Sequence, residues 1–166
     1  MNLEEFFDYK NRLMHDLLTN EKILELLKDE ANPTKKPEDF VYSQVFPYEY
    51  IPETLEYGMT FICCDVDIQQ SMNKTFLAPV VYVWVFSHKS KLQLPEGGLR
   101  TDKLAAEIAK TINGSRFYGL GELNLYSAKR FAPIVDYQGK ILTFHARDFN
   151  RKSPTGQPIP TNRKEY

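Results

Sequence analysis

Residues 80–86 have the sequence VVYVWVF, the strongest strand pattern in the chain. Successive side chains of a strand point to opposite faces of a sheet. The valines at positions 81, 83 and 85 would therefore share one face, and the aromatic residues that alternate with them would share the other. Since both faces are apolar, we expect this strand to lie in the middle of a sheet that is covered on both sides.

Three other segments are predicted to be strands of the same sheet. Their apolar and polar residues alternate, and turn residues bound them. The connection between the last two is expected to turn at Tyr137–Gly139, because glycine favours turns. The predicted strands are residues 60–68, 120–130 and 141–148.

Helices are predicted before and after the first two strands. Residues 1–30 carry apolar side chains at helical spacing, with a break near Thr19 and Asn20 where a second helix can begin. Residues 101–112 form one apolar stripe and predict a further helix. This order of elements predicts the α+β class: a mainly antiparallel sheet of four or more strands with a crossing helix on one face, N-terminal helices and an extended C-terminal arm.

Residues 31–58 differ from the rest of the chain. They contain four prolines and six aromatic residues. Prolines at this density exclude a long helix or a central strand. We expect an extended segment that is held by its rings, either to its own domain or to a neighbouring subunit. Its candidate interface residues are Phe46, Tyr48 and Tyr50.

Residues 150–166 are predicted to be an arm outside the core. They hold three prolines, four basic side chains and one acidic side chain, and Ile159 is almost their only apolar residue. We expect the arm to dock on a neighbouring subunit through Arg151, Lys152 and Ile159. The remaining residues are expected to form a single domain, 1–149, with a helical part (1–30), the extended segment (31–58) and a β-β-α-β-β core (60–149).

The composition favours a protein that assembles, and it argues against other classes. The chain has 166 residues and a mass of 19.3 kDa, which suits one domain. Lys plus Arg total 21 against 22 for Asp plus Glu, and this balance argues against a dedicated nucleic-acid binder. Aromatic residues are in excess, at 10 Tyr, 11 Phe and 1 Trp, as is typical of interfaces. We see no membrane-spanning stretch and no signal-peptide pattern, and we expect no membrane partner.

Cys63 and Cys64 are adjacent in a predicted strand. Their side chains would point to opposite faces, a poor geometry for a disulfide between them. We expect both to be reduced and buried in an intracellular protein.

Asp65 and Asp67 are two residues apart on the same predicted strand, so their carboxylates would project from one face. Such a pair can bind a metal or share acid and base roles. A metal-dependent hydrolase or nuclease is therefore one alternative, with a third ligand from Asp136, Glu122 or His145. We favour a solvated or subunit-facing strand edge, because no ligand-spacing motif accompanies the pair. We accordingly expect no catalytic residue, no metal and no cofactor.

Ten short stretches, none of them catalytic, follow one another from the extended segment to the last strand. They are Phe46–Pro52, Thr60–Cys63, Val83–His88, Gly98–Asp102, Leu104–Ile108, Ile112–Ser115, Gly119–Gly121, Arg130–Pro133, Tyr137–Gly139 and Arg147–Asn150. In order and spacing, the chain over residues 1–150 resembles the small neck proteins of tailed bacteriophages. The resemblance is closest to tail terminator and tail-completion proteins, whose helix-on-sheet subunits form a ring that caps the tail tube.

This resemblance implies a structural protein of the virion neck that is assembled in the cytoplasm of the bacterial host. It implies a homohexameric ring that contacts the tail tube protein and a head connector, stopper or adaptor protein. DNA would pass through the lumen without sequence-specific binding. An acidic lumen would repel DNA, and Asp65 and Asp67 are its candidate lining residues. The roles of tail terminator and head-completion or adaptor protein both stay open, and a partner-binding regulatory domain is a further alternative.

Overall fold

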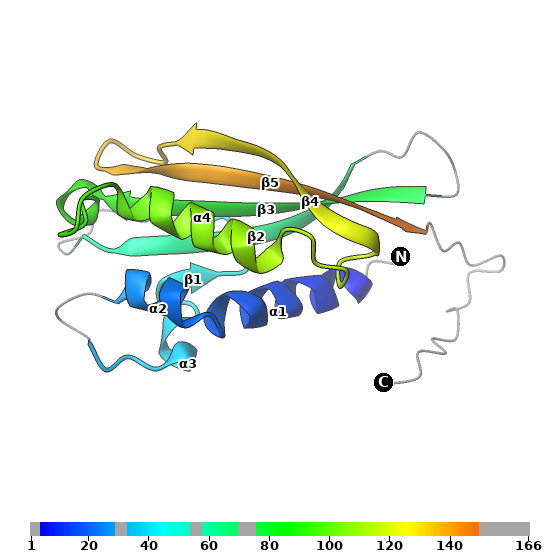
Figure 1. Cartoon of the computed structure of the whole chain (residues 1–166), viewed down its shortest axis with the longest axis horizontal. Helices are drawn as coiled ribbons and strands as arrows, with labels where there is room; N and C mark the ends of the chain where they lie inside the picture. Colours follow the sequence, from blue (N-terminus) through cyan, green and yellow to red (C-terminus); the bar gives the residue numbers. More distant parts are fainter. Residues whose placement is uncertain (1–3, 29–32, 54–57, 70–75, 150–166) are drawn as a thin grey trace.

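The computed structural model describes residues 4–28, 33–53, 58–69 and 76–149 (Figure 1). None of the helices in these ranges is long and apolar enough to cross a membrane. In chain order the elements are α1 (Glu4–Leu18), α2 (Glu21–Leu27), α3 (Pro37–Phe40), β1 (Val45–Phe46), β2 (Thr60–Gln69), β3 (Phe76–His88), the 3-10 turn η1 (Lys89–Lys91), α4 (Arg100–Ile112), β4 (Leu120–Phe131) and β5 (Tyr137–Phe149).

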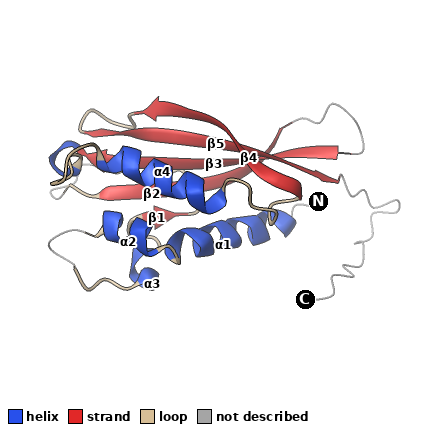
Figure 2. Ribbon diagram, in the orientation of Figure 1, coloured by secondary structure: helices blue, strands red, loops and turns tan. Residues whose placement is uncertain are grey.

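Within the described ranges, five strands form one sheet, in the order β1-β2-β3-β5-β4. β1 runs parallel to β2, and every other pair is antiparallel. Residues 80–86 lie in the central strand, as predicted, with two strands on either side. The helices α1, α2 and α4 pack on one face of the sheet (Figure 2). The predicted α+β class is confirmed.

One core lies between the sheet and these helices. The valines of β3 at positions 81, 83 and 85 are fully buried in it. α1 contributes Leu13 and Leu17, and α4 contributes Leu104 and Ile108. Burial of each such side chain stabilises the folded state by about 1.5–3 kcal/mol, so this core holds the helices on the sheet.

The opposite side of the sheet, on which none of the described helices packs and which we call the helix-free face, carries a second and largely aromatic core. Rings from the residues that follow β1 and side chains of the β4–β5 hairpin cover this core in place of a helix. Its buried members are Phe46, Phe61, Cys63, Trp84, Phe86 and Tyr137, and Tyr50, Phe131 and Ile134 pack against them.

The turn between the last two strands lies outside its predicted position. Tyr137–Gly139 are the first residues of β5, so the prediction of a turn there is wrong. Gly139 is needed for a close approach between strands. A Cβ atom at this position would collide with the carbonyl of Val85 and lie 2.6 Å from the Cα of Phe86. A glycine in a strand interior can mark such an approach as well as a turn.

β3 is longer than the predicted strand, because it begins at Phe76 and includes Pro79. A proline cannot donate a ladder hydrogen bond. Pro79 is paired with Ile68 of β2, while the ladder between β3 and β5 is interrupted at Ala78 and Pro79. Because the ladder is interrupted there, the N–H that Pro79 lacks leaves no hydrogen bond of the β3–β5 ladder unmade.

The extended segment contains a two-residue edge strand, β1, and the single turn of α3. Gln44 fixes it between α2 and β2. The buried Gln44 side chain donates from Nε2 to the carbonyls of Leu27 (2.8 Å) and Thr60 (3.0 Å). Its Oε1 accepts a hydrogen bond from Nζ of Lys35 at 2.8 Å, and its main-chain carbonyl accepts one from Ile62. Leu27 ends α2, so Gln44 satisfies a carbonyl that the helix end leaves free.

Replacing Gln44 with alanine should lower the free energy of unfolding by about 2–3 kcal/mol, because two buried carbonyl oxygens lose their donor. Urea unfolding followed by circular dichroism measures the change. Gln69→Ala, at an exposed position at the end of β2, is the control and should change stability by less than about 0.5 kcal/mol. A Gln44→Ala protein as stable as this control would contradict the role of Gln44.

Candidate functional site

The predicted interface residues of the extended segment form a stack of rings that leads from the surface into the aromatic core. Phe46 is only 5% exposed, and its ring lies parallel to that of Tyr50 with centroids 4.1 Å apart. Tyr50 in turn contacts Phe61 of β2 at 5.5 Å. The rings of Tyr48 and Phe46 are arranged edge to face with centroids 5.6 Å apart, and Tyr48 is 44% exposed. Tyr48 is therefore the member that reaches the surface, and it packs on Phe46, which in turn stacks on Tyr50.

Tyr42 extends this surface, although no pattern in the sequence distinguishes it from the other aromatic residues of the segment. The residue is 64% exposed, and the centroid of its ring lies 6.4 Å from that of Tyr48. Its φ of 55° is in the left-handed region, which glycine or asparagine usually occupies just after a helix end. We call five of the exposed residues at this edge of the sheet the β1 edge surface: Tyr42, Tyr48, Glu49, Ile51 and Glu53.

A second exposed surface lies on β4, at the other edge of the sheet (Figure 1). Tyr126 is 71% exposed, and its ring stacks on His145 of β5 with centroids 4.2 Å apart. The pairing of β4 with β5 shifts on either side of Leu125, so the strand is bulged there. We call four exposed residues of its later part the β4 edge surface: Leu125, Tyr126, Lys129 and Arg130. Glu122, near the start of β4, is also exposed, and its charge is paired with Arg116.

Asp65 and Asp67 both lie on the helix-free face of β2, but their surroundings differ. Asp65 is half-buried, and it accepts hydrogen bonds from Nζ of Lys10 at 2.5 Å and from the N–H of Val66 at 2.7 Å. Lys10 belongs to α1, so this ion pair ties the helix to the sheet edge. Asp67 is exposed, and among the described residues no ion pair neutralises its charge.

The candidate third metal ligands do not join the aspartate pair. Asp136 accepts from Lys89 at 2.6 Å, and Glu122 accepts from Arg116 at 2.8 Å. His145 is stacked on a tyrosine of β4. Within the described ranges, no three His, Cys, Asp or Glu side chains gather in a way that could hold a metal ion.

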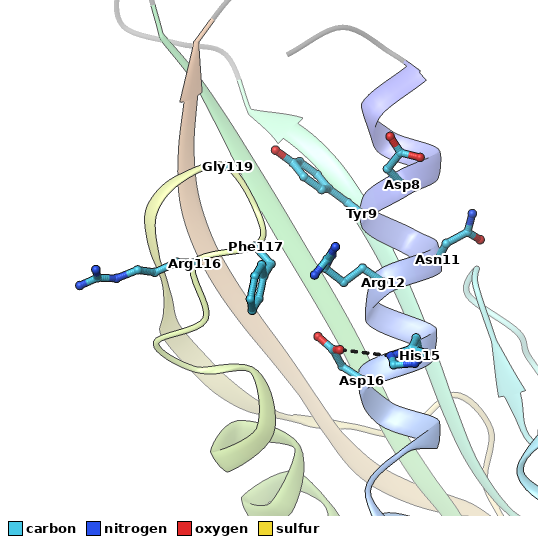
Figure 3. Close-up of a pocket in the computed structure, with 9 residues that line it drawn as sticks. All are labelled: Asp8, Tyr9, Asn11, Arg12, His15, Asp16, Arg116, Phe117 and Gly119. Atoms are coloured by element: carbon cyan, nitrogen blue, oxygen red, sulfur yellow. Dashed lines mark ion pairs between the residues drawn. The ribbon is translucent and has the colours of Figure 1, made fainter. Parts of the chain in front are cut away.

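A groove of about 690 Å³ lies between α1 and the α4–β4 connection (Figure 3). Arg12 points across it, with its guanidinium 4.6 Å from the ring centroid of Phe117. The hydroxyl of Tyr118 donates to Asp16 at 2.9 Å. Burial, followed by the negative charge of Asp16, raises the pKa of Tyr118, which keeps this hydroxyl protonated as a donor. These contacts engage both walls, and we assign the groove the structural role of holding α1 against the connection.

Arg151, Lys152 and Ile159 lie outside the described residues. Their predicted contact with a neighbouring subunit therefore stays a prediction.

Cys63 and Cys64 belong to different cores, Cys63 to the aromatic one and Cys64 to the helix-side one. Both are free thiols, and burial raises the pKa of each to about 12. The prediction of two buried, unbridged cysteines is confirmed. A thiol that keeps its proton is a poor nucleophile.

Stability should therefore fall as the pH rises above the ordinary thiol value of 9.0 toward about 12. In that window an unfolded thiol loses its proton and a folded one keeps it, so rising pH favours unfolding. We expect the urea midpoint to fall between about pH 8 and about pH 10, and to fall less in a variant with Cys63→Ala and Cys64→Ala. Equal pH dependence in the two proteins would contradict this assignment.

A model of one protein family, YomW, matches residues 20–146. The matched range begins at the N-cap of α2 and ends within β5, and it includes both edge surfaces and the aspartate pair. No curated protein matches the chain.

Proposed function

The chain belongs to the YomW family, and we propose that it is a structural protein of the phage head–tail neck. In this proposal its subunits form a hexameric ring that caps the tail tube and joins it to the head connector. The protein is a component of the virion, assembled in the host cytoplasm, and it acts without a catalytic residue, a metal or a cofactor.

The observation that carries the proposal is the pair of exposed apolar surfaces at opposite edges of one sheet. Exposed large apolar side chains that cluster on a surface mark sites of association. Tyr42, Tyr48 and Ile51 form one such group, and at the other edge Leu125 and Tyr126 expose apolar surface on the two sides of β4. Two different exposed apolar surfaces on one subunit allow head-to-tail association. Such association generates a closed ring when the rotations between successive subunits add up to a full turn.

The fold supports the same proposal. The resemblance to tail terminator and tail-completion proteins implies a subunit with a helix packed on a sheet, and α4 crosses one face of a five-stranded sheet here. The agreement concerns the fold alone, and unrelated proteins with different functions can share a fold of this kind. The shared fold nevertheless supports the proposed function, because the ten stretches of sequence that carry the resemblance also occur in the same order along the chain.

The lumen and the partners complete the proposal. We assign the helix-free face near Asp65 and Asp67 to the lumen, where negative charge repels DNA phosphates and lets DNA pass without sequence-specific binding. Asp67 contributes more than Asp65, because Lys10 pairs with Asp65. The proposed partners are the tail tube protein and a head connector, stopper or adaptor protein. Arg151, Lys152 and Ile159 of the arm would contact a neighbouring subunit.

A partner-binding regulatory domain is the second candidate function. The same exposed rings favour it, because a groove or patch of rings also suits a protein partner. It predicts a stable monomer in place of a ring. For a hydrolase built on Asp65 and Asp67, the described residues supply no third ligand near the pair.

Native mass by light scattering, over a wide range of protein concentrations, tests the proposal together with negative-stain microscopy of the same samples. We expect closed rings with six times the subunit mass of 19.3 kDa. If the isolated protein is monomeric, the measurement is repeated with tail tubes, on whose ends the ring should then assemble. A monomer that leaves tail tubes bare would contradict the proposed function and favour the regulatory domain.

A further inference from the structure

We propose that the subunits associate head to tail, with the β1 edge surface of one copy docked on the β4 edge surface of the next. This inference rests on the proposed ring and identifies the contact that closes it. The occupant of each surface is therefore a second copy of this chain.

Charge is the first argument, because the two surfaces are oppositely charged. Residues 48–53 contain Glu49 and Glu53 and no basic side chain. Residues 125–130 contain Lys129 and Arg130 and no acidic side chain. All four charged side chains are exposed. Two copies of the same surface would repel each other, whereas the unlike surfaces attract. Charge therefore favours a head-to-tail contact over a two-fold symmetric one.

Position in the fold is the second argument. β1 and β4 are the two edge strands of the sheet, with three strands between them. Part of each surface also opens toward the helix-free face. On β4 this part is Tyr126 and Lys129, since Leu125 and Arg130 pair with Phe144 and Lys140 on the helix side of β5. Tyr48 packs on the aromatic core of that face through Phe46, and Tyr126 stacks on His145, which is four residues after the core residue Ile141 on the same side of β5. Repeated contacts of this kind would turn the same face of every sheet toward a common axis.

The backbone of β4 is the third argument. At its start the outer edge is covered by the α4–β4 connection: Leu123 exchanges hydrogen bonds with Gly114 and Ser115, and Leu125 donates to Asn113 at 2.7 Å. Beyond the bulge, the alternation of the ladder turns the N–H and C=O groups of Ala128 and Arg130 away from β5, and no described residue bonds to them. An open edge of this kind accepts an extended segment from another chain.

Tyr42 is the fourth argument, because neither burial nor backbone geometry within the subunit explains a tyrosine there. The ring is largely exposed, and its left-handed backbone is strained for a bulky residue. Strain of this kind is found where function requires a particular side chain. In the proposed contact the ring is buried against the neighbouring copy, together with Tyr48.

Charge reversal in two variants tests the contact. The first carries Glu49→Lys and Glu53→Lys, and the second carries Lys129→Glu and Arg130→Glu. Each variant alone presents like charges at every contact, and we expect the dissociation constant to rise at least about tenfold. Mixed in equal amounts, the two variants should assemble again in alternation, because every contact then joins opposite charges. An even-numbered ring such as a hexamer permits that alternation.

The matched control carries Glu21→Lys and Glu25→Lys, the same change in charge on exposed positions of α2. It should assemble like the wild type. Recovery in the mixture shows that both reversed variants are folded. Full assembly of either reversed variant alone, or failure of their mixture to associate, would overturn the contact.

The readouts separate this inference from the proposed function. Wild-type rings with unaffected reversed variants would leave the ring in place and overturn the contact. Open chains of alternating variants, with no closed ring in the microscope, would support the contact and contradict the ring. If the wild type and the mixture are both monomeric, with and without tail tubes, both proposals fail.

Tyr42→Gly supplies a second and independent test. Glycine adopts the left-handed conformation without strain, so the urea midpoint of the subunit should stay unchanged or rise. The dissociation constant of the assembly should nevertheless rise several-fold, because a ring is lost from the contact. A lower midpoint with unchanged association would assign Tyr42 a structural role only and contradict its place in the contact.

Discussion

The central strand β3 is apolar on both faces, while the helices in the described part of the chain cover only one of them. This constraint shapes the rest of the molecule. The valines of β3 are buried beneath α1 and α4, but Trp84 and Phe86 need another cover. The chain supplies it with rings from a proline-rich segment, held in place by the buried side chain of Gln44. The need to cover an aromatic face thus brings Tyr42 and Tyr48 to the edge of the sheet, where they are exposed.

The same constraint separates structural from functional features. In the groove beside α1, charged and aromatic groups already contact one another, and the Tyr118–Asp16 hydrogen bond joins the two walls. At the two sheet edges, by contrast, rings and charges face solvent in the described part of the chain. An assembly subunit needs surfaces of this second kind. The edges of the sheet therefore support the proposed function more than any cavity does.

The sequence was informative where periodicity was long and strong. VVYVWVF placed the central strand, helical spacing placed α1, α2 and α4, and alternation placed the two cysteines on opposite faces. It was uninformative where one distant contact decides the local structure. Gly139 signals a turn in the sequence but serves a close approach to Phe86, and β1 is too short to show any period.

The candidate site shows the same limit. The sequence placed Asp65 and Asp67 on one face and singled out Tyr48. It could not show that Lys10, more than fifty residues earlier, pairs with Asp65. It could not distinguish the buried Phe46 from the exposed Tyr48, because both are aromatic residues between prolines. The β4 edge surface was missed because edge position is a property of the sheet order.

Electron cryomicroscopy of the assembled ring, at a resolution that separates strands, tests the central claim most directly. The account predicts that β4 of each subunit lies beside residues 48–53 of its neighbour, with Tyr48 buried between them and the helices on the other side of the sheet. A ring in which neighbouring subunits meet through α1 or α4, with both sheet edges in solvent, would contradict it.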